Sequence, residues 1–495
     1  MPALVLGCGG RRDDATAAVD PGPDLQVLGE SSRIRLEDPV PATSPWFDGA
    51  RVTLVAARGE TLGLQVLHRD SDAVALTVDG AGVRAFTVAS LPVVRPSTAL
   101  YSGTRPPGTY ADVLTPATAA PTSNPAYFEV VVPPTADPGL HRGELLVGSR
   151  RFPVELTVAP VTLPPLSPSV WAYEDPREFG WTDAEPQLID RAVPTPRERA
   201  CVALFREHGV VLAPDLPLAW WPTRKELLAG FPHIPVVLPD DAAQIAGDVR
   251  GWIAATRGTG QLPFAIPVDE PRTPEARAKV RAIGDAVHAA GGGLTTFRMA
   301  VTAEPHPDFG SAVDLHISWN AAHLTGDTSA RWTYNGAPPF AGSMTLDAAS
   351  PGTRTWGWIA HRYDIPVWYV WDALYWHDRH NRRGAPLPGR AFDPRDPVTF
   401  DDGEDHGNLD GVLALPSPTG CLPTLRLAAL RRGLLDRALL ALASRCSPSR
   451  TAALATRLIP VALADAPRGS PPSWPLSDLP FELARRELLD LASCR

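Results

Sequence analysis

Pro263-Phe-Ala-Ile-Pro-Val-Asp-Glu-Pro271 is the segment with the strongest fold signal in the chain. Its apolar first part is typical of a buried strand, and it ends in two adjacent carboxylates, Asp269 and Glu270. Pro271 then stops regular pairing, because proline has no N–H to donate. The alternative is a solvated acidic turn. Active sites of α/β barrels lie where strands end and loops begin, so a barrel context would make the pair a candidate for chemistry.

Eight strand-like runs alternate with helix-like segments between residues 169 and 410. The clearest helical pattern is Pro274–Ala290, with a proline at its start and Gly291 after its end. This alternation predicts a (β/α)8 barrel of the TIM type. The predicted strands lie near Val170–Tyr173, Val210–Ala213, Pro235–Leu238, Phe264–Val268, Leu294–Phe297, Leu315–Ser318, Arg331–Tyr334 and Val367–Trp371.

The sequence before the barrel reads as all-β. Runs such as Arg51–Ala56, Leu62–Leu67 and Ala73–Val78 alternate or are β-branched, and a hairpin is predicted around Gly148-Ser149. Short strands at this spacing predict a β-sandwich over residues 24–162. The proline-rich stretch Val161–Pro168 predicts the boundary with the barrel.

The sequence after the barrel changes to a helical pattern. Residues 411–495 predict a short strand at Gly411–Pro416, an amphipathic helix at Leu425–Ser444 and two further helical segments. We expect this part to pack on the barrel. The fold class is therefore multidomain: an N-terminal all-β sandwich, a central (β/α)8 barrel over residues 169–410 and a C-terminal helical appendage.

Bulk properties narrow the function classes. A chain of 495 residues is too long for one ordinary core. The net charge of −9 argues against a nucleic-acid surface and offers no polybasic membrane patch. No apolar run approaches the roughly 18 residues of a membrane span. Without a Walker loop or a dinucleotide fingerprint, we expect no cofactor. A Gly-x-Ser-x-Gly motif, which would mark a nucleophilic serine, is also absent from the sequence.

The first residues resemble the end of a bacterial lipoprotein signal. Val5-Leu-Gly-Cys8 is similar to a lipobox, so Cys8 is a candidate for lipidation and residues 1–23 for a signal remnant and tether. A basic segment is missing and the apolar stretch is short, which a start codon placed too far downstream would explain. The alternative is an ordinary N-terminus. We expect export to the bacterial cell envelope or beyond, with membrane contact only through this anchor.

Export would allow disulfides. Cys446 and Cys494 lie in the same C-terminal helical region and are the best candidates for a pair. Cys201 and Cys421 are equally compatible with buried thiols.

The adjacency of Asp269 and Glu270 restricts their chemistry. Adjacent carboxylates cannot flank a sugar ring as separated acid and nucleophile pairs do. They fit a mechanism in which one donates a proton and the other holds a nucleophile of the substrate itself, such as a 2-acetamido group. Repulsion between the two charges would raise one pKa.

Other strand ends carry aromatic and amide side chains. Aromatic faces cover the apolar face of a sugar ring, and amides and carboxylates bind its hydroxyls, so a glycan is the expected partner. The alternative for each tryptophan is a place in the core. The candidate binding residues are Tyr173, Trp319, Asn320, Tyr334, Asn335, Trp368, Trp371, Asp372 and Trp376.

Two polar segments lack metal-site spacing. Trp376–His380 has two histidines three apart without the helix context of zinc motifs, and Asp401–Asp405 does not match an EF-hand loop. We interpret both as solvated loops and predict no metal site.

Several segments together resemble glycoside hydrolase family 123. They are Arg331–Asn335, Thr355–Tyr363, Val367–Trp371, Gly411–Pro416 and Leu425–Asp436, with Arg58–Glu60 and Val130–Pro134 similar to the β-domain that precedes this catalytic domain. The resemblance covers nearly the whole chain in order.

The resemblance implies a retaining exo-β-N-acetylgalactosaminidase with substrate-assisted catalysis. The family's Asp-Glu pair falls on Asp269 and Glu270, which implies Glu270 as general acid/base and Asp269 as the residue that orients the acetamido group. Tyr334 is the candidate donor to the acetamido oxygen. Three family acids are missing from the C-terminal helix, at Ala428, Arg432 and Leu435. Because this helix packs rather than reacts, we expect altered packing.

Two other functions fit the same sequence. One is a non-catalytic, glycan-binding surface lipoprotein with a decayed barrel. The other is a cell-envelope scaffold in which the β-sandwich makes the contacts. Turnover of an aryl 2-acetamido glycoside separates the enzyme from both.

Overall fold

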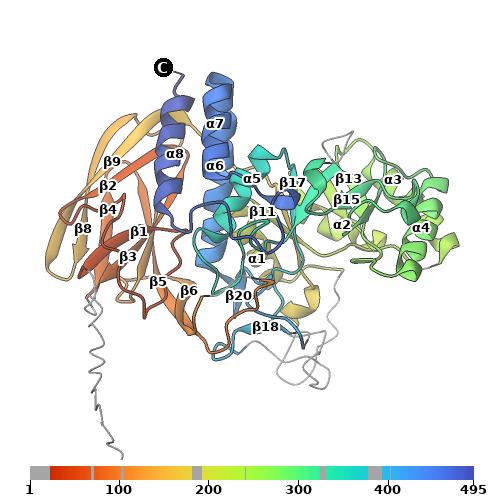
Figure 1. Cartoon of the computed structure of the whole chain (residues 1–495), viewed down its shortest axis with the longest axis horizontal. Coiled ribbons are helices and arrows are strands. Elements are labelled where there is room, and N and C mark those ends of the chain that lie inside the picture. Colours follow the sequence, from red (N-terminus) through yellow and green to blue (C-terminus); the bar gives the residue numbers. More distant parts are fainter. Residues whose placement is uncertain are drawn as a thin grey trace, which may run out of the picture.

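The computed structural model describes residues 23–68, 72–101, 105–180, 192–239, 241–323, 330–376, 393–401 and 403–494. Figure 1 shows the N-terminal sheets at one end of the molecule and the parallel strands with their helices at the other. The long helix α6 (Leu425–Cys446) stands between them. Cys8 and nearly all of the predicted tether lie outside the described residues.

The N-terminal part contains two sheets. Apolar side chains from both, such as Leu54 and Leu64, belong to one hydrophobic cluster. The predicted hairpin at Gly148-Ser149 is confirmed, with Val147 opposite Arg150. The first sheet has the order β1 (Leu25–Gly29), β3 (Thr61–His68), β7 (Ala126–Val131), β5 (Gly82–Val93) and β6 (Gly108–Pro116). The second has the order β2 (Val52–Arg58), β9 (Arg150–Thr162), β8 (Gly139–Val147) and β4 (Val74–Val78).

The central part is a ring of parallel strands, so the predicted TIM-like arrangement is present. Backbone contacts beyond the last residue of β11 close the ring: the Leu216 N–H donates to the Pro235 carbonyl at 3.0 Å, and the Val237 N–H donates to the Leu216 carbonyl at 3.1 Å. In chain order the eight strands are β10 (Val170–Tyr173), β11 (Val210–Ala213), β12 (His233–Pro235), β13 (Leu262–Ala265), β14 (Arg298–Val301), β15 (Leu315–Ile317), β16 (Arg331–Tyr334) and β17 (Val367–Val370).

Helices follow several of these strands. The predicted helix at Pro274–Ala290 is confirmed as α4 (Pro274–Ala289). It begins after Thr273, whose side chain accepts from the Ala276 N–H, and Gly291 follows its last turn. The other helices of this part are α1 (Pro196–Glu207), α2 (Trp221–Arg224), α3 (Ala242–Thr256) and α5 (Thr355–Arg362).

Three predicted strand positions need correction. The predicted strand at Leu294–Phe297 is a turn in which the Phe297 and Gly293 N–H groups bond each other's carbonyls, and β14 begins at Arg298. Threonine-rich sequence suggested a strand there, but three nearby glycines allow the tight turn. β12 starts two residues before the predicted Pro235, and β13 ends at Ala265, three residues before the predicted Val268.

Alternate residues of the barrel strands face two different cores. Trp171 and Tyr173 of β10 pack in one hydrophobic cluster, whereas Val170 and Ala172 belong to the other. Trp171 contacts Phe264 of β13 at 5.0 Å between ring centroids, across the ring rather than along it. The first cluster therefore includes the barrel interior, and the second lies under α1, α5 and α6.

The C-terminal part confirms the three predicted helices, whereas the strand predicted at Gly411–Pro416 starts three residues later, at Ala414. α6 starts after Thr424, whose hydroxyl accepts from the Leu427 N–H at 3.2 Å, and it runs two residues beyond the predicted Ser444. The other elements are β18 (Val398–Asp401), β19 (His406–Asn408), β20 (Ala414–Ser417), β21 (Gly420–Pro423), α7 (Pro448–Leu458) and α8 (Leu479–Ala492).

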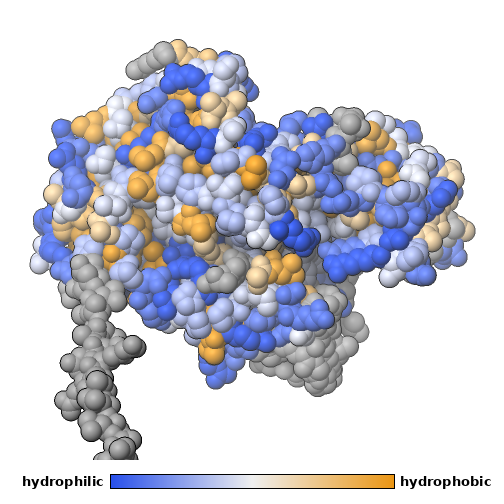
Figure 2. All heavy atoms as spheres, in the orientation of Figure 1, coloured by the Kyte–Doolittle hydropathy of each residue, from blue (hydrophilic) through white to orange (hydrophobic). Residues whose placement is uncertain are grey.

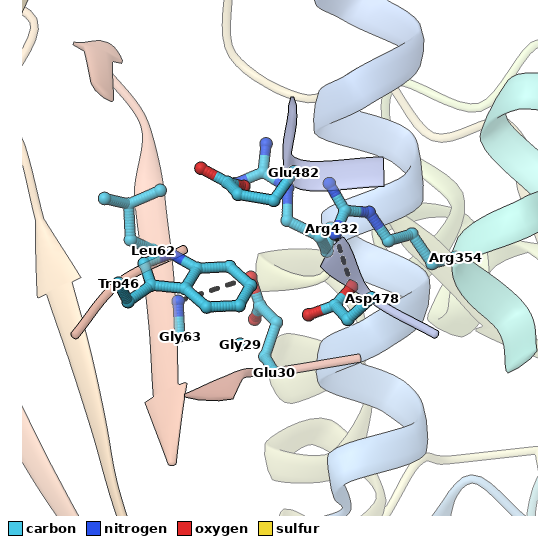
Figure 3. A pocket seen from close by; sticks show the side chains of 9 residues that line it. All are labelled: Gly29, Glu30, Trp46, Leu62, Gly63, Arg354, Arg432, Asp478 and Glu482. Carbon is cyan, nitrogen blue, oxygen red and sulfur yellow. Dashed lines mark hydrogen bonds and ion pairs between the residues drawn. The ribbon is translucent and has the colours of Figure 1, made fainter. Parts of the chain in front are cut away.

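Buried arginines of α6 bind carboxylates of the N-terminal sheets. Arg426 contacts Asp112, Arg431 contacts Glu30 and Glu129, and Arg432 contacts Glu60. In Figure 3, Glu30 and Arg432 of this set lie with Arg354, Asp478 and Glu482 around a cavity of about 10 Å³, which has room for about one water. The cavity thus lies where the N-terminal sheets, the barrel and the C-terminal helices contact one another. The two other positions without a family acid, Ala428 and Leu435, lie in hydrophobic clusters.

Both pairs of cysteines are joined. Cys446–Cys494 is the predicted pair, and it links the end of α6 to the chain after α8. Cys201–Cys421, which the sequence left open, links α1 of the barrel to the β20–β21 hairpin across 220 residues.

The surface is mostly polar on the face shown in Figure 2, with apolar residues scattered over it. Within the described residues, no helix combines the length and apolar character needed to cross a bilayer.

Candidate active site at the barrel mouth

Asp269 and Glu270 lie in the loop that follows β13, at the end of the ring where all strands finish. Thr302, directly after β14, joins them: its hydroxyl donates to Asp269 Oδ1 at 2.5 Å and accepts from the Glu270 N–H at 2.8 Å. Glu270 has a φ of +39°, which a residue with a side chain rarely adopts. Such strain persists where surrounding contacts hold it, often at functional sites. The backbone here is therefore fixed by a specific hydrogen-bonded bridge.

Two side chains contact the Glu270 carboxylate. The Tyr334 hydroxyl, at the end of β16, donates to Oε1 at 3.1 Å, and Arg272 forms an ion pair with Oε2. Arg272 is 82% exposed, so this ion pair contributes little to stability and a ligand can displace it. Residues from the ends of strands four and seven of the barrel, Glu270 and Tyr334, are thus in direct contact.

The electrostatics of the mouth are those of a desolvated acidic site. Asp269 is accessible to solvent as a residue, yet nearby protein atoms raise the pKa of its carboxyl by desolvation, and the charge of Glu270 raises it further. The Thr302 hydrogen bond acts in the opposite direction. Burial raises the pKa of Tyr334, and the Glu270 carboxylate adds to this effect. Tyr334 is therefore a hydrogen-bond donor across the neutral range.

Asn335 links the loops after β16 and β17. Its Oδ1 accepts from the Trp371 N–H at 3.1 Å, and its own N–H donates to the Tyr369 carbonyl at 2.8 Å. With a φ of +48°, Asn335 is, like Glu270, a residue of the mouth in the left-handed region. The Asn335 side chain thus positions the loop after β17. The sequence had suggested a role in sugar binding and not this one.

Trp319 lies beside Tyr334, the residue whose hydroxyl contacts Glu270. Its indole N–H donates to the Tyr334 carbonyl at 3.3 Å, and its ring stacks on Phe340 at 4.1 Å between centroids. Trp319, Asn320, Trp371 and Tyr173 are all partly accessible. Their predicted role as sugar ligands stays a prediction.

Three predicted binding residues lie in the core instead. Trp368, Asp372 and Trp376 are only 2%, 1% and 2% exposed. Trp368 stacks on Trp356 at 4.7 Å, and the Trp376 indole donates to the Ala414 carbonyl at 2.9 Å. The prediction that these three line the pocket is wrong. Strand alternation is the reason for Trp368, because its neighbours Val367 and Tyr369 face the interior cluster while Trp368 faces the outer one.

Besides Thr302 and Arg272, two further residues of the mouth, Tyr369 and Asp215, were missed from the sequence. Tyr369 is in the interior cluster, stacks on Trp171 at 4.4 Å and has its pKa raised by burial, with the charges of Asp215 and Asp269 adding to the effect. Asp215 comes two residues after Ala213, the last residue of β11. Both residues could have been found from the sequence. Tyr369 lies two positions after Val367 in the same predicted strand, so their side chains face the same side, and Asp215 follows a predicted strand just as Asp269 does.

The metal predictions are only partly within the described residues. His377–His380 and Asp402 lie outside them. Where the chain is described, no group of three or more histidine, cysteine, aspartate or glutamate residues is arranged to hold a metal ion. The expectation that no cofactor is needed stays a prediction.

Comparison with known proteins gives a result at the level of the fold. No family model and no curated protein matches the sequence. Among solved structures, a family 123 glycoside hydrolase from Clostridium perfringens, described in connection with glycolipid glycan hydrolysis, aligns with a TM-score of 0.62 over 94% of this chain and 98% of that chain. The fold is that of this family 123 enzyme. The sequences are 11% identical, so the likeness concerns architecture.

Two further structures align with low scores. They are a glycosyl hydrolase family 2 member from Bacteroides cellulosilyticus, with a TM-score of 0.25, 12% identity and coverage of 64% of this chain and 44% of that chain, and a putative α-galactosidase from Bacteroides fragilis, with a TM-score of 0.24, 8% identity and coverage of 79% and 78%. At these scores neither bears on the fold or the site.

Proposed function

We propose that the protein is a glycoside hydrolase that removes a terminal β-linked 2-acetamido sugar, similar to N-acetylgalactosamine, with retention of configuration. One observation carries the proposal: Asp269 and Glu270 stand together at the mouth of a parallel eight-stranded ring and are bridged by Thr302. The agreement of the fold with a family 123 glycoside hydrolase supports the same class of reaction.

The proposed reaction uses the two carboxyl groups differently. Glu270 donates its proton to the leaving glycosidic oxygen while the acetamido oxygen of the substrate attacks the anomeric carbon. Asp269 accepts a hydrogen bond from the acetamido N–H and stabilises the positive charge of the cyclic intermediate. Glu270, now a carboxylate, then takes a proton from the water that opens this intermediate. The sugar is released with its original configuration.

Tyr334 remains the candidate donor to the acetamido oxygen. In the structure its hydroxyl donates to Glu270 Oε1 at 3.1 Å, so a bound substrate would have to redirect it. Arg272, the other ligand of Glu270, is exposed and would give way to the leaving group.

Glu270→Gln tests the enzyme directly. The amide keeps the shape of the side chain but has no acidic proton, so kcat/KM for an aryl 2-acetamido-β-glycoside with a poor leaving group should fall by about 10²- to 10⁴-fold. Asp285→Asn, a surface carboxylate of α4 that is 61% exposed, is the matched control and should keep full activity. An aryl β-galactoside, which lacks the acetamido group, should not be cleaved. Equal turnover of both glycosides would contradict the substrate-assisted mechanism.

A glycan-binding protein without catalysis is the alternative. Wild type would then turn over no aryl glycoside or natural glycan, and Glu270→Gln would retain sugar on an affinity column as well as wild type does. Retention without turnover would favour this alternative over the enzyme.

We also propose export and a β-sandwich at the N-terminus. The two disulfides are typical of proteins that fold in oxidising compartments. The shared core of the two N-terminal sheets supports a sandwich over residues 24–162, ahead of a barrel at 169–410 and an appendage at 411–495. Lipidation at Cys8 is part of this proposal, and mass spectrometry of the membrane fraction tests it.

A further inference from the structure

We propose that Asp215 is a substrate-binding residue of this site, whose carboxyl group takes a hydroxyl of the sugar ring. The inference rests on the proposed function and adds a residue and a ligand group to it. Asp215 belongs to neither of the features that first pointed to the site, the Asp-Glu pair and the aromatic strand ends.

The backbone brings Asp215 to the mouth. β11 ends at Ala213, whose side chain faces the barrel interior. Asp215 comes two positions later, and residues two apart along a strand face the same side. Leu216 then pairs with Val236 where the ring closes, so the chain is still in line with the strand at this point. Because all strands of the ring are parallel, the ends of strands two and four lie on the same side, and Asp269 follows strand four.

The charges around Asp215 support its place near the site. The negative charge of Asp269 raises its pKa, after the larger effect of burial, to about 7. Asp215 and Asp269 in turn both raise the pKa of Tyr369. Asp215, Asp269 and Tyr369 therefore form one electrostatically coupled group at the mouth.

The carboxyl of Asp215 has an unused oxygen. The residue is partly accessible, but its Oδ1 atom is sealed from bulk solvent and has no hydrogen-bond partner among the described residues. A buried, unsatisfied carboxyl oxygen costs free energy, and native proteins contain few of them. A role in binding a ligand group would account for a carboxyl kept at this cost.

The chemistry suits a hydroxyl group. A carboxyl near its pKa can donate a hydrogen bond when protonated and accept one when ionised, and a sugar hydroxyl is both donor and acceptor. Tyr369, which lies within range of the Asp215 charge and stacks on the buried Trp171, is the aromatic residue of this group. A phosphate fits less well, because Asp269 adds negative charge and Asp215 itself is acidic.

Asp215→Asn measured against deoxy sugars tests the contact. On the parent aryl 2-acetamido-β-glycoside the variant should lose about 10- to 100-fold in kcat/KM, as expected for one buried hydrogen bond to a ligand. On the one deoxy analogue that lacks the contacted hydroxyl, wild type and variant should be nearly equal. Equal losses on the parent and on every singly deoxygenated analogue would overturn the proposal.

Asp215→Leu provides a second readout that does not depend on turnover. Removing an unsatisfied buried carboxyl should leave the free energy of unfolding unchanged or raise it. Asp314→Leu is the matched control, because the Asp314 carboxylate at the opposite end of the ring accepts from the Met299 N–H at 2.8 Å and contacts His288 at 3.0 Å. That variant should be less stable. Marked destabilisation by Asp215→Leu would show a structural role and overturn the proposal.

The two proposals fail in different ways. If wild type cleaves no glycoside, the proposed function fails; saturation-transfer NMR with free N-acetylgalactosamine then tests Asp215, and unchanged binding in Asp215→Asn would overturn the inference. If wild type is active but Asp215→Asn behaves like wild type, only the inference fails.

Discussion

At the scale of single residues, the site depends on how Thr302 arranges two like charges. Asp269 and Glu270 are neighbours in the sequence, and the Thr302 hydroxyl donates to one and accepts from the other's backbone. The resulting geometry holds Glu270 in a left-handed conformation, while Tyr334 fixes its carboxylate from the opposite side of the mouth. Neither contact can be read from the Asp-Glu motif, because both partners come from other strands.

Thr302→Val should separate the arrangement of the pair from its chemistry. Valine keeps the shape but leaves Asp269 Oδ1 and the Glu270 N–H without this partner, so kcat/KM should fall by about 10- to 100-fold and stability by roughly 1–2 kcal/mol. Thr302→Ser keeps the hydroxyl and should retain most of the activity. Steady-state kinetics and urea denaturation measure both. Full activity in Thr302→Val would show that the bridge is dispensable.

Asp215 predicts a pH dependence of stability. Its pKa rises from the ordinary 3.8 to about 7 in the folded protein, so the folded state holds the proton more tightly than the unfolded chain does. This contribution to stability is present at low pH and is lost as the pH rises from about 4 through 7. Asp215→Asn lacks it, so its stability relative to wild type should increase over that range by up to roughly 4 kcal/mol. Parallel pH profiles of the unfolding free energy for the two proteins would contradict this.

At the scale of elements, α6 connects all parts of the molecule. Arg426, which is fully buried, contacts Asp112 of β6 with two nitrogens and also donates to the carbonyls of Met344 and Leu409. Arg432, where the resembled family carries an acid, pairs with Glu60 at 2.7 Å and with Asp436 at 3.1 Å. The expected change in packing thus takes the form of a buried ionic network between helix and sheet.

Arg426→Met should destabilise the protein strongly. It removes one partner of a buried pair and leaves Asp112 uncompensated, which typically costs about 3–5 kcal/mol. Arg51→Met is the control, since the Arg51–Glu155 pair at 2.9 Å is exposed and should be worth at most about 1 kcal/mol. Guanidinium denaturation of the two variants measures the difference. Similar small losses would show that Arg426 is not a structural centre.

At the scale of the whole molecule, the three regions of the chain share their cores. One cluster contains Leu91 and Tyr110 of the N-terminal sheets, Trp358 of α5 and Leu430 of α6. The boundaries that proline-rich sequence suggested therefore mark changes of architecture, and the regions on either side depend on one another for burial. The Cys201–Cys421 disulfide adds a covalent link between barrel and C-terminal hairpin.

Removal of the Cys201–Cys421 disulfide should lower the free energy of unfolding. Cys201→Ser combined with Cys421→Ser opens a loop that spans 220 residues, and the loss should be about 2–5 kcal/mol. Peptide mapping without reduction should show the pairs Cys201–Cys421 and Cys446–Cys494. Free thiols at these positions in protein produced in an oxidising compartment would contradict the pairing.

The sequence by itself determined much of the local structure and the candidate catalytic pair Asp269-Glu270. Strands β10, β11 and β16 and helix α4 follow from hydrophobic pattern and caps, because these signals act over a few residues. Tertiary structure decided which side chains reach the mouth. Trp368 and Tyr369 are adjacent, but the phase of the strand buries the first in the outer core and turns the second inward. Asp215, Thr302 and Asp269 follow three different strands, and only the closed parallel ring brings Thr302 into contact with Asp269 and Asp215 within range of the Asp269 charge.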